Sequence, residues 1–78
     1  MPGLHKRSLV LAGHRTSLAL EPEFWATLEQ AATQRDISLA ALVAEIDRAR
    51  GDASPDRLLA SACRVFALAW TRDYCGPT

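Results

Sequence analysis

The stretch that decides the fold is Arg15–Trp25, RTSLALEPEFW, in which a short alternating segment runs directly into the start of a helix. Successive side chains of a strand point to opposite faces. One face of this segment is mostly apolar and consists of Thr16, Leu18 and Leu20. The other face consists of Arg15, Ser17 and Ala19. Pro22 then ends the strand, because proline has no backbone N–H, and suits the first turn of a helix.

A single strand followed only by helices must find a partner, because unpaired backbone donors and acceptors are costly. Residues 8–12, SLVLA, form a second candidate strand upstream, and Gly13-His14 between the two segments is suited to a tight turn. The partner of Arg15–Leu20 is therefore either this upstream segment or the same strand in a second copy of the chain.

The apolar periodicity predicts a first helix over residues 22–34 and a second from Ser38 to about Arg50. Ser38 is the expected N-cap of the second helix, and Gly51 is expected to end it. The apolar stripe of the first helix is Trp25, Leu28, Ala31 and Ala32. The stripe of the second is Leu39, Leu42, Val43 and Ile46.

Ser54-Pro55 resembles a further cap with proline at the first helical position, which predicts a third helix from Pro55 to about Asp73. The apolar residues of this helix cover a wide arc, so we expect it to be buried on more than one side. They are Leu58, Leu59, Ala62, Val65, Phe66, Ala69 and Trp70.

The chain has 78 residues and zero formal net charge, which gives room for one domain with a small core. Domains of this size bury only about 60% of their unfolded surface, which favours dimerisation as a source of stability. We expect a flexible basic N-terminus at 1–7, the domain at 8–74 and a tail at 75–78. No signal sequence or membrane span is evident, so a cytoplasmic location is expected.

Catalysis finds little support in the sequence. The only histidines, His5 and His14, lie near the N-terminus without an acid at a spacing that would orient them. Cys63 is typical of a small core residue and Cys75 of a tail thiol, and the two do not have the spacing of a zinc site. We therefore expect no enzymatic activity, no cofactor and no metal.

The order of strand, helix, short turn and helix resembles the ribbon-helix-helix domain of bacterial repressors such as the Met repressor. The resemblance is carried by residues 13–17, 20–25, 37–39 and 44–47, and residues 60–66 are similar to one subfamily of small bacterial proteins with this fold. It implies a mainly α fold with a short β-ribbon, an intertwined homodimer in which each chain gives one strand to the ribbon. The C-terminal helix and the strand at 8–12 are additions to that plan. The implied dimer core is Leu18, Leu20, Trp25, Leu28, Leu42 and Ile46.

The same resemblance implies a DNA-binding transcriptional regulator whose ribbon enters the major groove. By alternation, the residues expected to contact bases are Arg15, Ser17 and Ala19. At the start of the second helix, Ser38 and the adjacent amide of Leu39 are expected to contact a phosphate. A cluster of positive charge precedes the first acid, Glu21, and adds Lys6 and Arg7 as expected phosphate contacts.

The alternative function is a dimeric protein-interaction or scaffold module that does not bind DNA. Zero net charge and the small Ala19 favour it, as does the upstream strand, because a four-stranded dimer sheet is too broad for the groove. A protein partner would then contact the C-terminal helix through Trp70 and Tyr74, which are residue types enriched at interfaces. The other interpretation of this helix is that it closes the dimer core.

The alternation of residues 15–20 makes a prediction about strand register. Leu18→Lys should destroy the fold because it places a charge on the core face, whereas Ser17→Lys should be tolerated on the opposite face. A one-residue error in register would exchange the two results, since it moves every side chain to the other face. Thermal melts of the two variants measure the difference.

Overall fold

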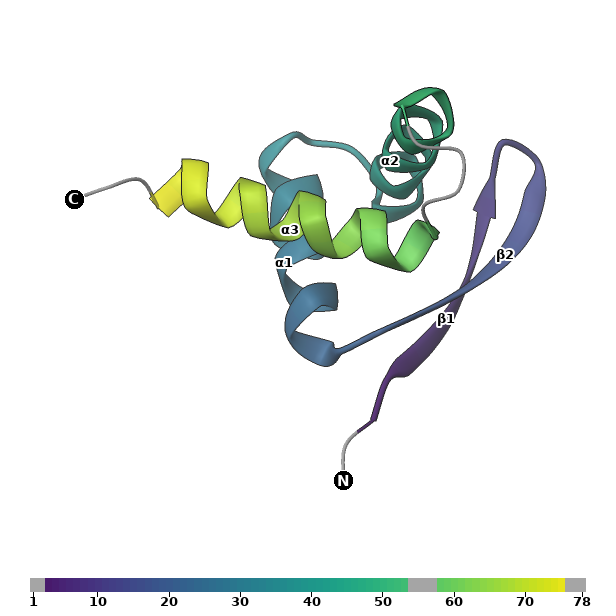
Figure 1. Ribbon diagram of the computed structural model, residues 1–78, viewed down its shortest axis with the longest axis horizontal. Helices are drawn as coiled ribbons and strands as arrows, with labels where there is room; N and C mark the ends of the chain where they lie inside the picture. Colours follow the sequence, from purple (N-terminus) through teal and green to yellow (C-terminus); the bar gives the residue numbers. More distant parts are fainter. Residues whose placement is uncertain (1–2, 54–57, 76–78) are drawn as a thin grey trace.

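The fold is a β-hairpin followed by three helices (Figure 1), seen in a computed structural model that describes residues 3–53 and 58–75. The elements in chain order are β1 (His5–Leu11), β2 (His14–Leu20), α1 (Pro22–Gln34), α2 (Leu39–Ala53) and α3 (Leu59–Cys75). The helices pack against one another and the hairpin lies along one side of them. The expected mainly α fold with a short ribbon and an additional C-terminal helix is confirmed.

The partner of β2 is the upstream strand of the same chain. β1 and β2 pair antiparallel, with Ser8 opposite Ser17 and Leu11 opposite His14. The turn between them consists of Ala12 and Gly13, whose φ angles are 52° and 84°. Two consecutive positive φ angles are the mark of the two-residue turn that matches the twist of a hairpin.

β1 begins at His5, three residues before the expected start at Ser8, so part of the expected flexible N-terminus belongs to the strand. The cause is a contact from far along the chain. The indole Nε1 of Trp25 donates a hydrogen bond of 2.7 Å to the carbonyl of His5. Nearby, the Arg7 guanidinium lies 4.6 Å from the centre of the Trp25 ring and bonds to Glu29 at 2.7 Å. Ala12, expected at the end of this strand, lies in the turn.

The register predicted for β2 is confirmed, because Leu18 is 3% exposed and Leu20 is fully buried while Ser17 is exposed. One side of the hairpin packs towards the helices and contributes Leu11, Leu18 and Leu20 to the core. The residues named from sequence as a dimer core are all buried within a single chain. They are Leu18, Leu20, Trp25, Leu28, Leu42 and Ile46.

The bounds of α1 agree with the prediction, and so does the tight connection that follows it. Asp36 has a φ of 59°, its amide bonds to the Thr33 carbonyl, and the amide of Ile37 bonds to the Ala32 carbonyl, both at 3.0 Å. This pair of bonds is the Schellman helix ending, here with aspartate in the left-handed position. Ser38 then caps α2, since its Oγ accepts the Ala41 amide at 3.0 Å, as predicted.

Two helix boundaries differ from the sequence-based expectation. α2 continues to Ala53, so Gly51 lies inside the helix and does not end it. Glycine tolerates helical backbone angles at a cost of about 1 kcal/mol relative to alanine, so its presence alone does not fix a helix end. α3 begins at Leu59 and ends at Cys75, and the expected cap at Ser54-Pro55 falls outside the described residues.

Within the single chain, the third helix is buried on one side, and not on more than one side as was expected. Its inner face buries Ala62, Cys63 and Ala67. On the outer side, Leu58 just before the helix and Val65 and Leu68 within it are 74%, 51% and 59% exposed. No helix in the described part of the chain is long and apolar enough to cross a membrane.

An ion pair lies at the connection between the hairpin and the helices. Arg64 of α3 donates from Nε to Oε1 of Glu21 at 3.0 Å, and its guanidinium lies 5.9 Å from the Phe24 ring centre. A hydrogen bond with its own backbone amide, and then the bond from Arg64, lower the pKa of the Glu21 carboxyl below its ordinary value of 4.5. The contact links α3 to the point where β2 passes into α1.

The burial of the core predicts that truncating a buried leucine lowers stability more than truncating an exposed one. Leu42→Ala should destabilise the protein by about 2 to 5 kcal/mol, because Leu42 is fully buried and its truncation leaves a cavity. Leu68→Ala is the matched control and should change stability by less than about 0.5 kcal/mol, since Leu68 is 59% exposed. Urea denaturation of both variants measures this. Equal losses would contradict the described core.

Glu21 predicts a pH dependence of stability. Because its pKa is lower in the folded than in the unfolded state, its contribution is fully present above the ordinary value of 4.5 and is lost as pH falls through the folded pKa. Glu21→Gln should therefore be less stable than wild type at pH 7, and the gap should close below pH 4.5. The deficit of Arg64→Met should shrink over the same range. A gap for Glu21→Gln that stays constant from neutral to acid pH in thermal melts would refute the assignment.

Candidate nucleic-acid interface

The hairpin presents one side to solvent, which we call the solvent face. It is made of three cross-strand pairs, which are Lys6 with Ala19, Ser8 with Ser17, and Val10 with Arg15. Ala19 is half-buried and the other five side chains are exposed. Arg7, Leu9 and Leu11 point to the other side of β1, because side chains alternate along a strand.

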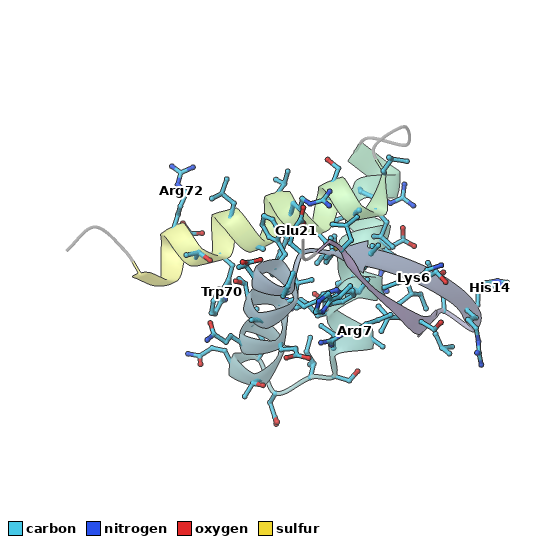
Figure 2. All side chains as sticks on the ribbon, turned by 90° about the horizontal axis from the view of Figure 1, so that it is seen from below. Lys6, Arg7, His14, Glu21, Trp70 and Arg72 are labelled. Atoms are coloured by element: carbon cyan, nitrogen blue, oxygen red, sulfur yellow. The ribbon has the colours of Figure 1, made fainter. Side chains whose placement is uncertain are left out.

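The solvent face carries positive charge that no described acid neutralises. Within the part of the chain that the structure describes, Lys6 and Arg15 form no ion pair, and the hairpin contains no acidic residue. Four arginines outside the solvent face form ion pairs with acids: Arg7 with Glu29, Arg35 with Glu45, Arg50 with Asp47, and Arg64 with Glu21. Figure 2 shows Lys6 and His14 on the hairpin and Arg72 on α3 at the opposite end of the molecule.

The dimensions of this face follow from the register. It is two strands wide, about 4.8 Å between strand axes. Arg15 pairs with Val10, four residues along β1 from Lys6, so the two basic side chains stand about 13 Å apart along the strands. Along the hairpin, pairs joined by backbone hydrogen bonds alternate with pairs that are not, starting from the hydrogen-bonded pair Leu11–His14 beside the turn. Ser8 and Ser17 are therefore a non-hydrogen-bonded pair, with Cβ atoms about 4.5–5.5 Å apart. The face therefore has a cation at each end and two hydroxyls at its centre.

The structure brings together four of the residues predicted to contact DNA. Arg15, Ser17 and Ala19 lie on the solvent face, as the alternation predicts, and Lys6 joins them from β1. Arg7 does not, because it lies on the opposite side of the hairpin, bonded to Glu29 and stacked on Trp25.

The start of α2 carries the other two predicted contacts. Ser38 is exposed and Leu39 is half-buried there. The first amides of a helix have no partner within it, so the amide of Leu39 retains the donor on which the predicted phosphate contact depends.

Sequence reasoning missed Ser8 and Val10 as members of the solvent face. Within residues 8–12, SLVLA, apolar side chains fall on both faces, so the segment shows no alternation. Only the register with β2 shows that Val10, 58% exposed, faces solvent beside Arg15. The position of the turn could have revealed these two residues. Once a two-residue turn is placed at residues 12–13, Ser8 must lie opposite Ser17.

Two other features of the described residues are a groove and a buried cysteine. An open groove of about 570 Å³ between α1 and α3 is lined by one carboxylate, amides, a hydroxyl and an indole, with no histidine or cysteine. Its lining residues are Ala26, Glu29, Gln30, Thr33, Gln34 and Trp70. Cys63 is fully buried, as expected of a core residue, and burial raises the pKa of its thiol to about 11. Among the described residues, no three His, Cys, Asp or Glu side chains lie together as metal ligands.

Comparison with known proteins gives a family and no individual relative. No curated protein and no solved structure matches the chain. Residues 4–71, which include the hairpin and nearly all of the three helices, match the family described as the ribbon-helix-helix domain. That match spans most of the 78 residues, so the chain belongs to the ribbon-helix-helix domain family.

Proposed function

We propose that this protein is a transcriptional regulator that binds double-stranded DNA by placing the solvent face of its hairpin in the major groove. The observation that carries the proposal is the two-stranded ribbon, whose outer face has no acid and carries two cations that form no ion pair with any described residue. The major groove, about 12 Å wide, admits a ribbon of two strands. Membership of a family whose domains are generally DNA-binding regulators supports the proposal.

Each residue of the solvent face that was predicted from sequence has a role suited to its chemistry. Arg15 makes a bidentate contact with the O6 and N7 atoms of guanine, which are the acceptors of that base in the groove. Ser17 donates to or accepts from a base edge, and Ala19 contacts a thymine methyl group. Lys6, at the far end of the face, pairs with a backbone phosphate.

Two further regions contribute without reading bases. The exposed start of α2, with the Ser38 side chain and the amide of Leu39, binds a phosphate at the positive end of the helix dipole. Arg7 acts indirectly, because its bond to Glu29 and its position over Trp25 fasten β1 to α1. It therefore fixes the angle at which the ribbon leaves the helices.

The proposed active form is a homodimer in the bacterial cytoplasm, as the family resemblance implies. Pairing of two β2 edges would give a four-stranded sheet about 14 Å across its outer strand axes, which exceeds the ribbon that the groove admits. The proposal therefore requires the second copy to join through another surface, unlike the shared ribbon that the resemblance implies, so that each hairpin remains two strands wide.

A second candidate function is a protein-interaction or scaffold module that keeps the fold without binding DNA. Two observations favour it. The pairing of β1 with β2 makes a dimer sheet of four strands too broad for the groove, and Leu58, Val65 and Leu68 are exposed along the outer side of α3. Trp70 is half-buried, and the side chain of Tyr74 lies outside the described ones. The DNA titration below separates the two functions.

Arg15→Ala should weaken binding to a specific site by about 1 to 3 kcal/mol and relax its selectivity, because it removes the bidentate base contact. Lys6→Ala should weaken binding to all sequences alike and lower the salt slope by about one. Arg72→Ala is the matched control, since Arg72 is exposed on α3 at the other end of the molecule. The measurement is an anisotropy titration at two salt concentrations, with duplexes enriched from a random pool by the wild-type protein.

Failure of the wild type to enrich any sequence, with only weak binding to bulk duplex at low salt, would replace the regulator with the interaction module. Equal losses for Arg15→Ala and Arg72→Ala would place the DNA surface somewhere other than the hairpin.

A further inference from the structure

We propose that the open groove between α1 and α3 binds a small organic cation with a flat amidinium or guanidinium head, held by Glu29 and Trp70. The inference goes beyond the proposed function, because the groove shares no residue with the solvent face of the hairpin and its occupancy does not require DNA.

The groove has the size of a small-molecule site. Its volume of about 570 Å³ lies within the range of about 300–1,000 Å³ that is typical of ligand pockets. Trp70 reaches from α3 towards α1 and forms one wall (Figure 2). The other wall is one side of α1, where exposed residues recur at spacings of three and four. They are Ala26, Glu29, Gln30, Thr33 and Gln34.

The charge of the lining favours a cation. Among the described residues that line the groove, Glu29 is the only charged one. The other polar groups on α1 are the neutral side chains of Gln30, Thr33 and Gln34. An anion finds no positive partner in this lining, whereas a cation finds a carboxylate and, around it, amide and hydroxyl oxygens that accept further N–H groups.

The Glu29 carboxylate has capacity for a second donor. Arg7 donates from Nη1 to Oε2 of Glu29 at 2.7 Å. A carboxylate has two oxygens with about four lone-pair sites, so Oε1 can accept from a ligand while Oε2 keeps its bond to Arg7. The Glu29 side chain is 50% exposed, which gives a ligand in the groove access to it.

The chain itself contains an example of the recognition we propose. The Arg7 guanidinium bonds to Glu29 and lies 4.6 Å from the centre of the Trp25 ring, so a flat cation is held there by a carboxylate and an indole. The groove presents the same two groups, Glu29 and the indole of Trp70. The face of a tryptophan ring attracts a cation, and a planar head stacks on it with little loss of hydrogen bonding at its edge.

Arg7 and the ligand share one negative charge, which gives the site a specific signature. Two cations beside the same carboxylate repel each other. Removal of the Arg7 guanidinium should therefore strengthen ligand binding, although Arg7 is not among the residues that line the groove. A ligand bound without Glu29 would not respond to Arg7 in this way.

The experiment titrates the full-length protein with benzamidine, whose head is a charged amidinium at neutral pH. Binding is followed by NMR through the backbone amides and the indole N–H signals of the two tryptophans, with Trp70→Phe to identify the Trp70 signal. Benzamide is the matched ligand, because it has nearly the same shape and no charge. We expect benzamidine to shift the signals of α1 and of the Trp70 indole saturably, with a Kd of about 1 mM, and benzamide to bind at least tenfold more weakly.

Three variants test the role of the carboxylate. Glu29→Gln should weaken benzamidine binding about tenfold or more, and Arg7→Met should strengthen it about threefold or more. Glu45→Gln is the matched control, since Glu45 is an acid on α2 that bonds to Arg35 at 2.8 Å with a similar exposure and does not line the groove. It should leave the Kd unchanged. Thermal melts check that the variants stay folded.

Several results would overturn the inference. These are no saturable shift at α1 and Trp70 in wild type, equal binding of benzamide and benzamidine, or equal losses for Glu29→Gln and Glu45→Gln. An unchanged Kd for Arg7→Met would refute the shared carboxylate. Should a variant not fold, the comparison of benzamidine with benzamide on the wild-type protein decides. No DNA is present in the titration, so its result is independent of the proposed function.

Discussion

The pairing of β1 with β2 inside one chain is the constraint on which the rest of this structure depends. It gives hydrogen-bond partners to backbone N–H and C=O groups that a single strand would leave unpaired, and it determines which side chains face the helices. The leucines of the hairpin then complete the core over Trp25 and Leu28. The same register leaves Lys6, Ser8, Val10, Arg15 and Ser17 on the opposite side, so core formation and the solvent face follow from one set of hydrogen bonds.

Much of the fold was predictable because its signals are local. Pro22 and the stripe from Trp25 to Ala32 fix α1, and the Ser38 hydroxyl caps α2 as expected. The start of β1 was not predictable, because the bond from Trp25 to the His5 carbonyl joins residues 20 positions apart. The end of α2 was missed for another reason: Gly51 is compatible with both a cap and a helix interior.

The site and α3 show the limit of periodicity. Alternation placed Arg15, Ser17 and Ala19 correctly on one face of β2, but the apolar run at residues 8–12 concealed the matching face of β1. In α3, a wide apolar arc predicted burial on several sides, yet within the single chain Val65 and Leu68 stay exposed, and the side that packs against the domain carries Ala62, Cys63 and Ala67 with the partly buried Leu59, Phe66 and Trp70. A pattern shows which side chains are apolar, and only the tertiary arrangement determines which of them acquire neighbours.

The most direct test of the central claim is an isotope-filtered NMR experiment on a mixture of labelled and unlabelled chains. It asks whether the contact between the Hα atoms of Ser8 and Ser17, expected for a non-hydrogen-bonded antiparallel pair, arises within a chain or between chains. The account predicts that the contact appears in the uniformly labelled sample and is absent from the filtered spectrum. A Ser8–Ser17 contact seen only between labelled and unlabelled chains would show that two chains share the ribbon, and would contradict the account.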